Sequence, residues 1–146
     1  FRATIEEFVA LAFFLPVVAG MGGNSGIQTL TVITRGIALG EIEFSTGLRA
    51  MAKEFWVGTV IGLVTGVLSA GLAYLWHGSP LLGLVLFTAM VVTLAVASLL
   101  GAAVPLALKG LRQDPALGAG VIVTTLTDAV AFVTFLGTAT LLLERI

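Results

Sequence analysis

The chain has 146 residues, of which 58% are hydrophobic and only 10% are charged. Soluble domains carry about 25% charged residues, so this chain has too little polar surface to cover a water-soluble globule of its size. The net charge of -1 offers no basic surface for nucleic acid. The absence of cysteine excludes disulfides, thiolate metal sites and cysteine nucleophiles. These figures indicate a single integral membrane domain.

Charged residues and turn formers divide the sequence into four apolar segments, each long enough to cross a bilayer, which takes roughly 20 residues. The segments are too long for the strands of a membrane barrel and lack alternation of period two, so we expect helices. The expected fold is an all-α membrane bundle, part of a larger one. Its four transmembrane helices are expected at residues 8–39, 56–76, 81–108 and 116–143.

The basic residues predict the orientation. Five of them flank or occupy two charged connections, residues 40–55 and 109–115, and two lie at the chain ends. By the positive-inside rule both connections face the cytoplasm, so we expect a multi-pass protein of the inner (plasma) membrane. A chain that begins outside without a signal peptide also needs an upstream helix. The five residues are Arg35, Arg49, Lys53, Lys109 and Arg112, and the other two are Arg2 and Arg145.

The second segment carries a stripe of small residues, Gly58, Gly62 and Gly66. Glycines four residues apart let two helix backbones approach closely in lipid. The spacing predicts a helix–helix contact at this stripe, but it leaves open whether the partner helix belongs to the same chain or to a second copy.

Asp128 is the one ionisable residue deep inside an apolar segment, because the other seven carboxylates lie at chain ends or in connections. A charge at the bilayer centre costs about 2.5–3.5 kcal/mol on insertion scales, which makes such a residue a functional candidate. Thr124 and Thr125 supply oxygen atoms on a similar helical face. An oxygen-rich site suits a hard cation. The alternative is a buried Asp128 that is protonated or hydrogen-bonded to a neighbouring helix.

The first segment combines helix breakers with polar residues. Pro16 and the glycines Gly22, Gly23 and Gly26 predict a kinked or unwound helix, which a membrane tolerates only against protein or a watery cavity. Beyond this break polar residues recur at helical spacing, so we expect them to line an aqueous path together with the Asp128 face. The candidate lining residues are Asn24, Gln28 and Thr31, with Thr125 from the fourth segment, and Arg35 continues the stripe.

No enzyme active site is expected. Residues 23–26 match the Gly-x-Ser-Gly pattern of rhomboid-type proteases, but the sole histidine, His77, lies in the outer turn, far from Ser25. A phosphate-binding loop is excluded because no lysine follows the glycines.

Two motifs resemble the MgtE family of magnesium channels and transporters. The run PVVAGMGGNSGIQT at residues 16–29, followed by Arg35-Gly36 and Gly40-Glu41, is similar to the family's second transmembrane helix. Asp114-Pro115-Ala116, followed by TTLTD at residues 124–128, is similar to the start and middle of its fifth helix. The resemblance covers almost the whole chain.

The resemblance implies a Mg²⁺-selective channel pore at the axis of a homodimer, lined by the first and fourth segments. It also implies that Asp128 holds a hydrated Mg²⁺, helped by the backbone carbonyl of Thr124. The family's first transmembrane helix and N-terminal cytosolic regulatory domains, which the sequence does not contain, are expected partners together with lipid. Two alternative functions remain open: a cation-coupled secondary transporter of divalent metals, and a non-conducting membrane interaction module.

Overall fold

The computed structural model describes residues 9–116 and 118–143, which form four α helices and no strand. The helices are α2 (Ala10–Ala38), α3 (Phe44–His77), α4 (Pro80–Gly110) and α5 (Ala119–Leu143). Each is long and apolar enough to cross a membrane, which confirms the predicted all-α membrane fold. The predicted start of the first span at Phe8 lies outside the described residues, as do Arg2 and Arg145.

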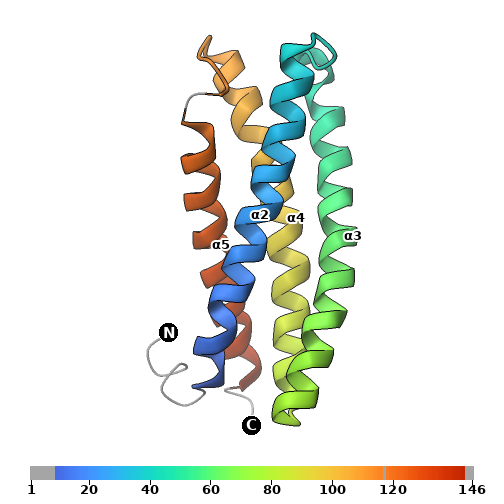
Figure 1. Cartoon of the computed structure of the whole chain (residues 1–146), viewed down its shortest axis with the longest axis vertical. Helices are drawn as coiled ribbons and strands as arrows, with labels where there is room; N and C mark the ends of the chain where they lie inside the picture. Colours follow the sequence, from blue (N-terminus) through green and yellow to red (C-terminus); the bar gives the residue numbers. More distant parts are fainter. Residues whose placement is uncertain (1–8, 117, 144–146) are drawn as a thin grey trace.

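Successive helices run in opposite directions (Figure 1). The connection after α2 and the connection after α4 lie at one end of the bundle, and the turn between α3 and α4 lies at the other. At this turn Gly78 adopts a left-handed φ of 67°, and the Ser79 hydroxyl accepts a hydrogen bond of 3.3 Å from the Leu82 amide. The two charged connections therefore lie on the same side of the bundle.

The second helix begins earlier than predicted, so our expectation of a connection over residues 40–55 was wrong. α3 begins at Phe44 instead of Trp56, and the connection before it is residues 39–43. A capping box explains this start, because the Glu43 amide donates to the Thr46 hydroxyl at 3.0 Å and the Glu43 side chain accepts from the Thr46 amide. With 34 residues, α3 is about 51 Å long, so its charged first turns extend beyond a hydrocarbon core of about 30 Å.

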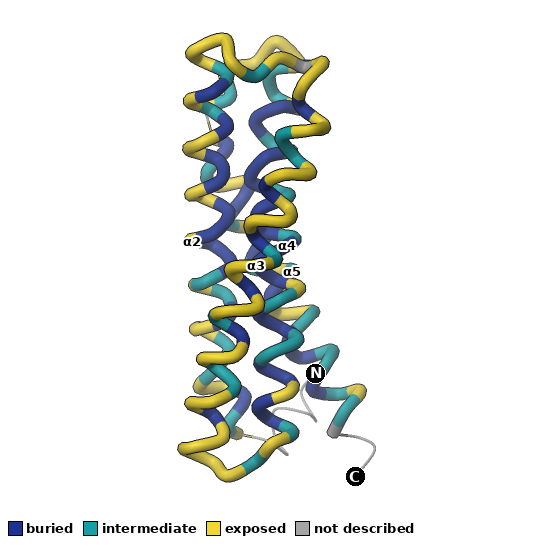
Figure 2. The backbone as a smooth tube through the Cα atoms, turned by 90° about the vertical axis from the view of Figure 1, so that its right-hand side faces the viewer, coloured by how far each residue is buried: buried dark blue, intermediate teal, exposed yellow. Residues whose placement is uncertain are grey.

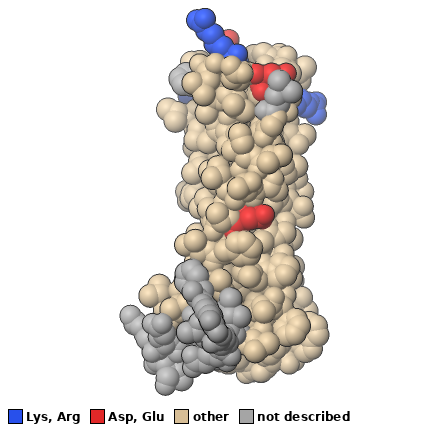
Figure 3. Space-filling view, turned by 90° about the vertical axis from the view of Figure 1, so that its left-hand side faces the viewer, with Lys and Arg blue, Asp and Glu red and all other residues tan. Residues whose placement is uncertain are grey.

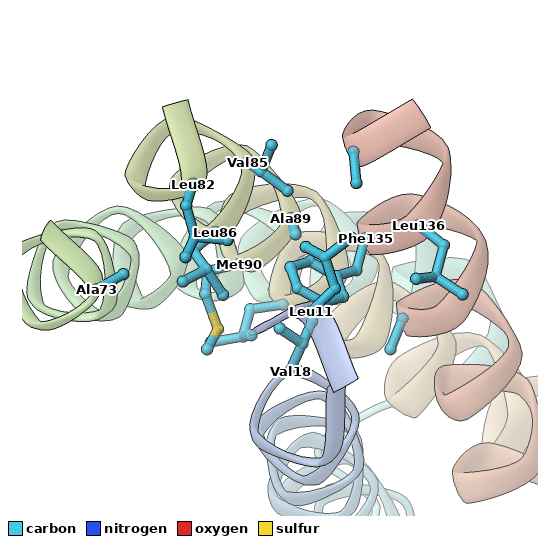
Figure 4. Packing of buried hydrophobic residues seen from close by; sticks show 13 residues of the cluster. Leu11, Val18, Ala73, Leu82, Val85, Leu86, Ala89, Met90, Phe135 and Leu136 are labelled. Atoms are coloured by element: carbon cyan, nitrogen blue, oxygen red, sulfur yellow. The ribbon is translucent and has the colours of Figure 1, made fainter. Parts of the chain in front are cut away.

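α4 is the central helix of the bundle. It packs against each of the other three helices, α2 also packs against α5, and α2 and α3 barely touch. Figure 2 shows the buried backbone on the inner sides of the helices. The largest hydrophobic cluster joins all four helices, through Leu11 of α2, Ala73 of α3, Met90 of α4 and Phe135 of α5 (Figure 4). The outer surface is apolar as well, as expected of a lipid-facing surface.

The glycine stripe of α3 packs against α4 of the same chain. A Cβ atom on Gly62 would lie 2.8 Å from Val91 Cα, and one on Gly66 would lie 3.1 Å from the Phe87 carbonyl oxygen. Both distances are shorter than ordinary van der Waals contact, so side chains here would push the helices apart. The stripe therefore serves close packing within the chain.

α2 is continuous from Ala10 to Ala38, with Pro16 inside it, so the predicted unwinding was wrong. The glycines instead give neighbouring helices room to approach. A Cβ atom on Gly22 would lie 2.8 Å from Thr93 Cγ2 of α4, and one on Gly26 would lie 2.7 Å from Val123 Cγ1 of α5. The helix stays regular because these contacts require missing side chains and do not require a changed backbone.

Candidate functional site

Asp128 lies near the middle of α5 and is partly buried. Figure 3 shows an isolated acidic patch half-way along one face of the bundle, surrounded by uncharged surface, whereas the basic side chains on that face gather at one end. Among the described residues Asp128 takes part in no hydrogen bond or ion pair. It is therefore a carboxylate at membrane depth that has no intrachain partner in this part of the chain.

A cluster of metal-ligating side chains is absent from the part of one chain that the structure describes. This part contains no group of three or more His, Cys, Asp and Glu side chains that could hold a metal ion. Mg²⁺ keeps several of its waters and binds through one or two carboxylates. A site of this kind therefore does not require a cluster of three or more such side chains.

Glycines allow α2 to approach α5 closely at the helical turns that precede Asp128. A Cβ atom on Gly23 would lie 3.4 Å from Thr124 Cγ2, and one on Gly120 would lie 3.6 Å from Ile27 Cδ1. Thr124 precedes Asp128 by one helical turn, so it lies on the same side of α5. The contact between α2 and α5 therefore brings together the two segments that the sequence analysis expected to line one path.

The predicted lining residues of α2 are exposed. Asn24, Gln28 and Thr31 lie on the outer side of α2, Thr125 is exposed on α5, and Thr124 is partly buried between the two helices. In the described part of the chain none of them bonds to Asp128. The structure thus leaves the two polar faces next to each other and uncovered.

The threonine hydroxyls among the predicted lining residues donate to their own helices. Thr31 Oγ1 donates to the Ile27 carbonyl at 2.8 Å, Thr125 Oγ1 donates to the Val121 carbonyl at 2.8 Å, and Thr124 Oγ1 donates to the Gly120 carbonyl. Because their protons are engaged, these oxygens can act toward the outside only as acceptors. Acceptors are the groups that water bound to a cation requires, since such water donates both of its protons.

The carbonyl of Thr124 already has a partner. Thr127 Oγ1 donates to this oxygen at 3.0 Å, in addition to the amide that the helix provides. Because a carbonyl oxygen has two lone pairs, Thr127 competes directly with any ion or ion-bound water at this atom. Asp128 is therefore the group with the greater free capacity for a cation.

Comparison with known proteins identifies the family. The model of the MgtE family, described as divalent cation transporters, matches residues 15–138. The chain belongs to the MgtE family. It is 38% identical to the magnesium transporter MgtE of Bacillus subtilis over 140 residues, which is 96% of this chain and 31% of the relative. It is also 38% identical to the MgtE of Thermus thermophilus over 146 residues, which is 100% of this chain and 32% of the relative.

A third relative is the magnesium transporter MgtE of Enterococcus faecalis, which is 30% identical over 144 residues and matches 99% of this chain. The chain spans about a third of the length of these MgtE relatives. The family assignment confirms the resemblance to the MgtE family, and the four helices, each long and apolar enough to cross a membrane, are consistent with a multi-pass membrane protein.

Sequence reasoning missed a second buried carboxylate in this MgtE-family chain. Glu54 lies inside α3 with 9% of its surface exposed, and Thr29 Oγ1 of α2 donates to its Oε2 at 3.4 Å. Next to it, the hydroxyls of Ser25 and Ser98 lie 3.0 Å apart. A cavity of about 140 Å³ borders Glu54 and these three hydroxyl side chains.

A signal for Glu54 was present in the sequence. It precedes Gly58 by four residues and so continues the small-residue stripe by one helical turn. Because that stripe is the face of α3 that packs against α4, a residue on it is buried. The burial of Glu54 was missed because the neighbouring charges of Arg49 and Lys53 led us to predict a connection over the whole stretch.

Proposed function

We propose that this chain forms the pore of a Mg²⁺-selective channel that conducts hydrated divalent cations at a homodimer axis. The observation that carries the proposal is Asp128, a carboxylate near the middle of the apolar helix α5 with no partner in the described part of the chain. The names of the relatives, magnesium transporters, support the choice of ion.

In this proposal a second copy of the chain covers Asp128 and adds a second carboxylate to the site. An unpaired carboxylate facing lipid would cost about 2.5–3.5 kcal/mol. A two-fold axis beside the contact of α2 with α5 covers Asp128 and sets a second Asp128 opposite it. Two carboxylates neutralise one Mg²⁺ and favour divalent over monovalent cations.

Polar residues along the α2 and α5 faces hold the ion's water. In this proposal Asn24, Gln28, Thr31 and Thr125 accept hydrogen bonds from water bound to Mg²⁺, and the Thr124 carbonyl contributes when Thr127 releases it. The ion then crosses without losing its hydration shell. Selectivity over the larger Ca²⁺ arises from the size of the cavity, because Mg²⁺ requires near-ideal octahedral geometry.

The test is current recording from the purified chain in planar bilayers with Mg²⁺ as the sole permeant cation. We expect discrete single-channel currents that reverse at the Mg²⁺ equilibrium potential. Transport of Mg²⁺ into vesicles without such currents would contradict the channel and favour a cation-coupled carrier. The buried Glu54, a second carboxylate with its own cavity, is the observation that supports this alternative. No transport in either assay would favour a non-conducting interaction module.

We further propose that the chain lies in the plasma (inner) membrane with both charged connections in the cytoplasm. Single cysteines can test this, because the chain has none of its own. Ser45→Cys and Leu111→Cys, both at exposed positions of the charged end, should resist an impermeant thiol reagent in intact cells. His77→Cys, exposed at the opposite end, should be labelled. Labelling of Ser45→Cys from outside would reverse the proposed orientation.

A further inference from the structure

A pocket of about 480 Å³ lies between α2 and α3 at the charged end of the bundle. Its basic side chains come from both helices: Arg35 lies in the last turn of α2, and Arg49 and Lys53 lie one turn apart on α3. Glu41 also borders the pocket, so three positive charges and one negative charge leave a net charge of +2. All four side chains are exposed, and none forms an ion pair within the described residues.

The backbone of the α2–α3 connection builds one wall of this pocket. The amides of Glu41 and Ile42 donate to the Gly36 carbonyl at 2.9 and 3.1 Å, which folds the connection back over the end of α2. The Ile42 side chain then covers Gly36, where a Cβ atom would lie 2.9 Å from Ile42 Cγ1. Lys109 Nζ of α4 donates to the Ile42 carbonyl at 3.0 Å and holds the connection in place.

The pocket combines basic and apolar lining. Val32 and Ala50, with Gly36 and Ile42, supply apolar surface beside the basic side chains. α2 and α3 barely touch, so the pocket lies between two helices that are not closely packed. A ligand that combines a phosphate with apolar chains matches both parts, and a volume of this size lies within the range of about 300–1,000 Å³ that is usual for ligand pockets.

We propose that this pocket binds the phosphate of an anionic phospholipid from the adjacent leaflet. Arg35 and Arg49 hold the phosphate through paired N–H donors, Lys53 adds its charge from one turn deeper, and the acyl chains lie along Val32 and Ala50. Basic pockets between transmembrane helices are suited to anionic headgroups. The proposal concerns a site apart from Asp128 and does not rest on the proposed transport function.

The test is native mass spectrometry of the purified chain in neutral detergent, titrated with dioctanoyl phosphatidylglycerol and, separately, with dioctanoyl phosphatidylcholine. We expect saturable binding of the anionic lipid only. The variant with Arg35→Gln, Arg49→Gln and Lys53→Gln should bind it roughly 100-fold more weakly, and Arg49→Gln alone roughly fivefold more weakly. Glu41→Gln should bind it more tightly, because it removes the negative charge at the pocket.

Arg112→Gln is the matched control, since Arg112 lies at the same end of the bundle but does not line the pocket. Its binding should equal that of the original chain. An equal loss in Arg112→Gln, equal binding of both lipids, or unchanged binding in the triple variant would overturn the proposal. Inorganic phosphate is the last arm, and displacement of the lipid by millimolar phosphate would show a site for free anions instead. Circular dichroism checks that each variant stays helical.

Discussion

Replacing Asp128 by asparagine should weaken Mg²⁺ binding by about 100-fold or more and reduce discrimination against monovalent cations. The substitution keeps the shape of the side chain and removes a charge from each copy at the proposed two-fold axis. A hydrogen bond to a charged group contributes about 1.5–3 kcal/mol, and about 1.4 kcal/mol corresponds to a factor of ten. Titration calorimetry measures the affinity, and reversal potentials with Mg²⁺ opposite Na⁺ measure the selectivity.

Asp114→Asn is the matched control for this experiment. Asp114 is exposed in the connection after α4, and its Oδ1 accepts from the Ala116 amide at 2.9 Å, a bond that asparagine can keep. It should leave both readouts unchanged, and Asn24→Ala and Gln28→Ala should have smaller effects than Asp128→Asn. If Asp128→Asn conducted Mg²⁺ with unchanged selectivity and unchanged block by Ca²⁺, Asp128 would be structural and the ion would be recognised elsewhere.

The number and directions of the helices were predictable because hydrophobic length is a local property. Segments such as residues 81–108 need no knowledge of their neighbours to be recognised as spans. The start of α3 was not predictable from hydropathy, since a helix does not end where the membrane ends. Its first turns are stabilised by the capping box of Glu43 and Thr46, a local hydrogen-bond pattern that operates in water as well as in lipid.

The role of the glycines of α2 could not be predicted, because a single sequence does not say which helices pack against them. Together with Pro16 they predicted a kinked or unwound helix, whereas α2 is continuous and Gly22, Gly23 and Gly26 are its contact points with α4 and α5. Which outcome occurs depends on the atoms of the opposing helices, such as Val123 and Thr127, and those atoms are distant in the sequence. Asp128 was recognisable because its isolation in an apolar segment is itself a local feature.

Within the described helices, Glu54 and Asp128 are carboxylates in different environments, which suit them to different roles. Glu54 receives a hydrogen bond from Thr29 and lies between three helices of one chain. Asp128 has no such partner in the described part of the chain and lies on an outer face. A carboxylate satisfied from within the chain stabilises one arrangement of its helices, whereas a carboxylate left open on the surface is available to an ion or a second copy.

Gly62→Ala should destabilise the bundle by about 1–3 kcal/mol, the usual cost of overpacking. The added Cβ atom would lie 2.8 Å from Val91 Cα and 3.1 Å from the Met90 carbonyl oxygen. These are backbone atoms, which cannot rotate away as the end of a flexible side chain can, so α3 and α4 have to separate. Separation loses contacts along the whole stripe, including those of Gly58 and Gly66, because a helix moves as a rigid body.

Gly71→Ala makes the same change on the same helix, at a position with no neighbouring atom within 4 Å. It should leave stability unchanged or slightly raised, because alanine favours the helix over glycine by up to about 1 kcal/mol. Unfolding of both variants by sodium dodecyl sulfate in mixed micelles, followed by circular dichroism, measures the difference. Equal stability of the two variants would mean that the stripe is not a close contact within the chain. The contact of α3 with α4 would then have to depend on the larger side chains around it, and the glycines would be free to face a second copy.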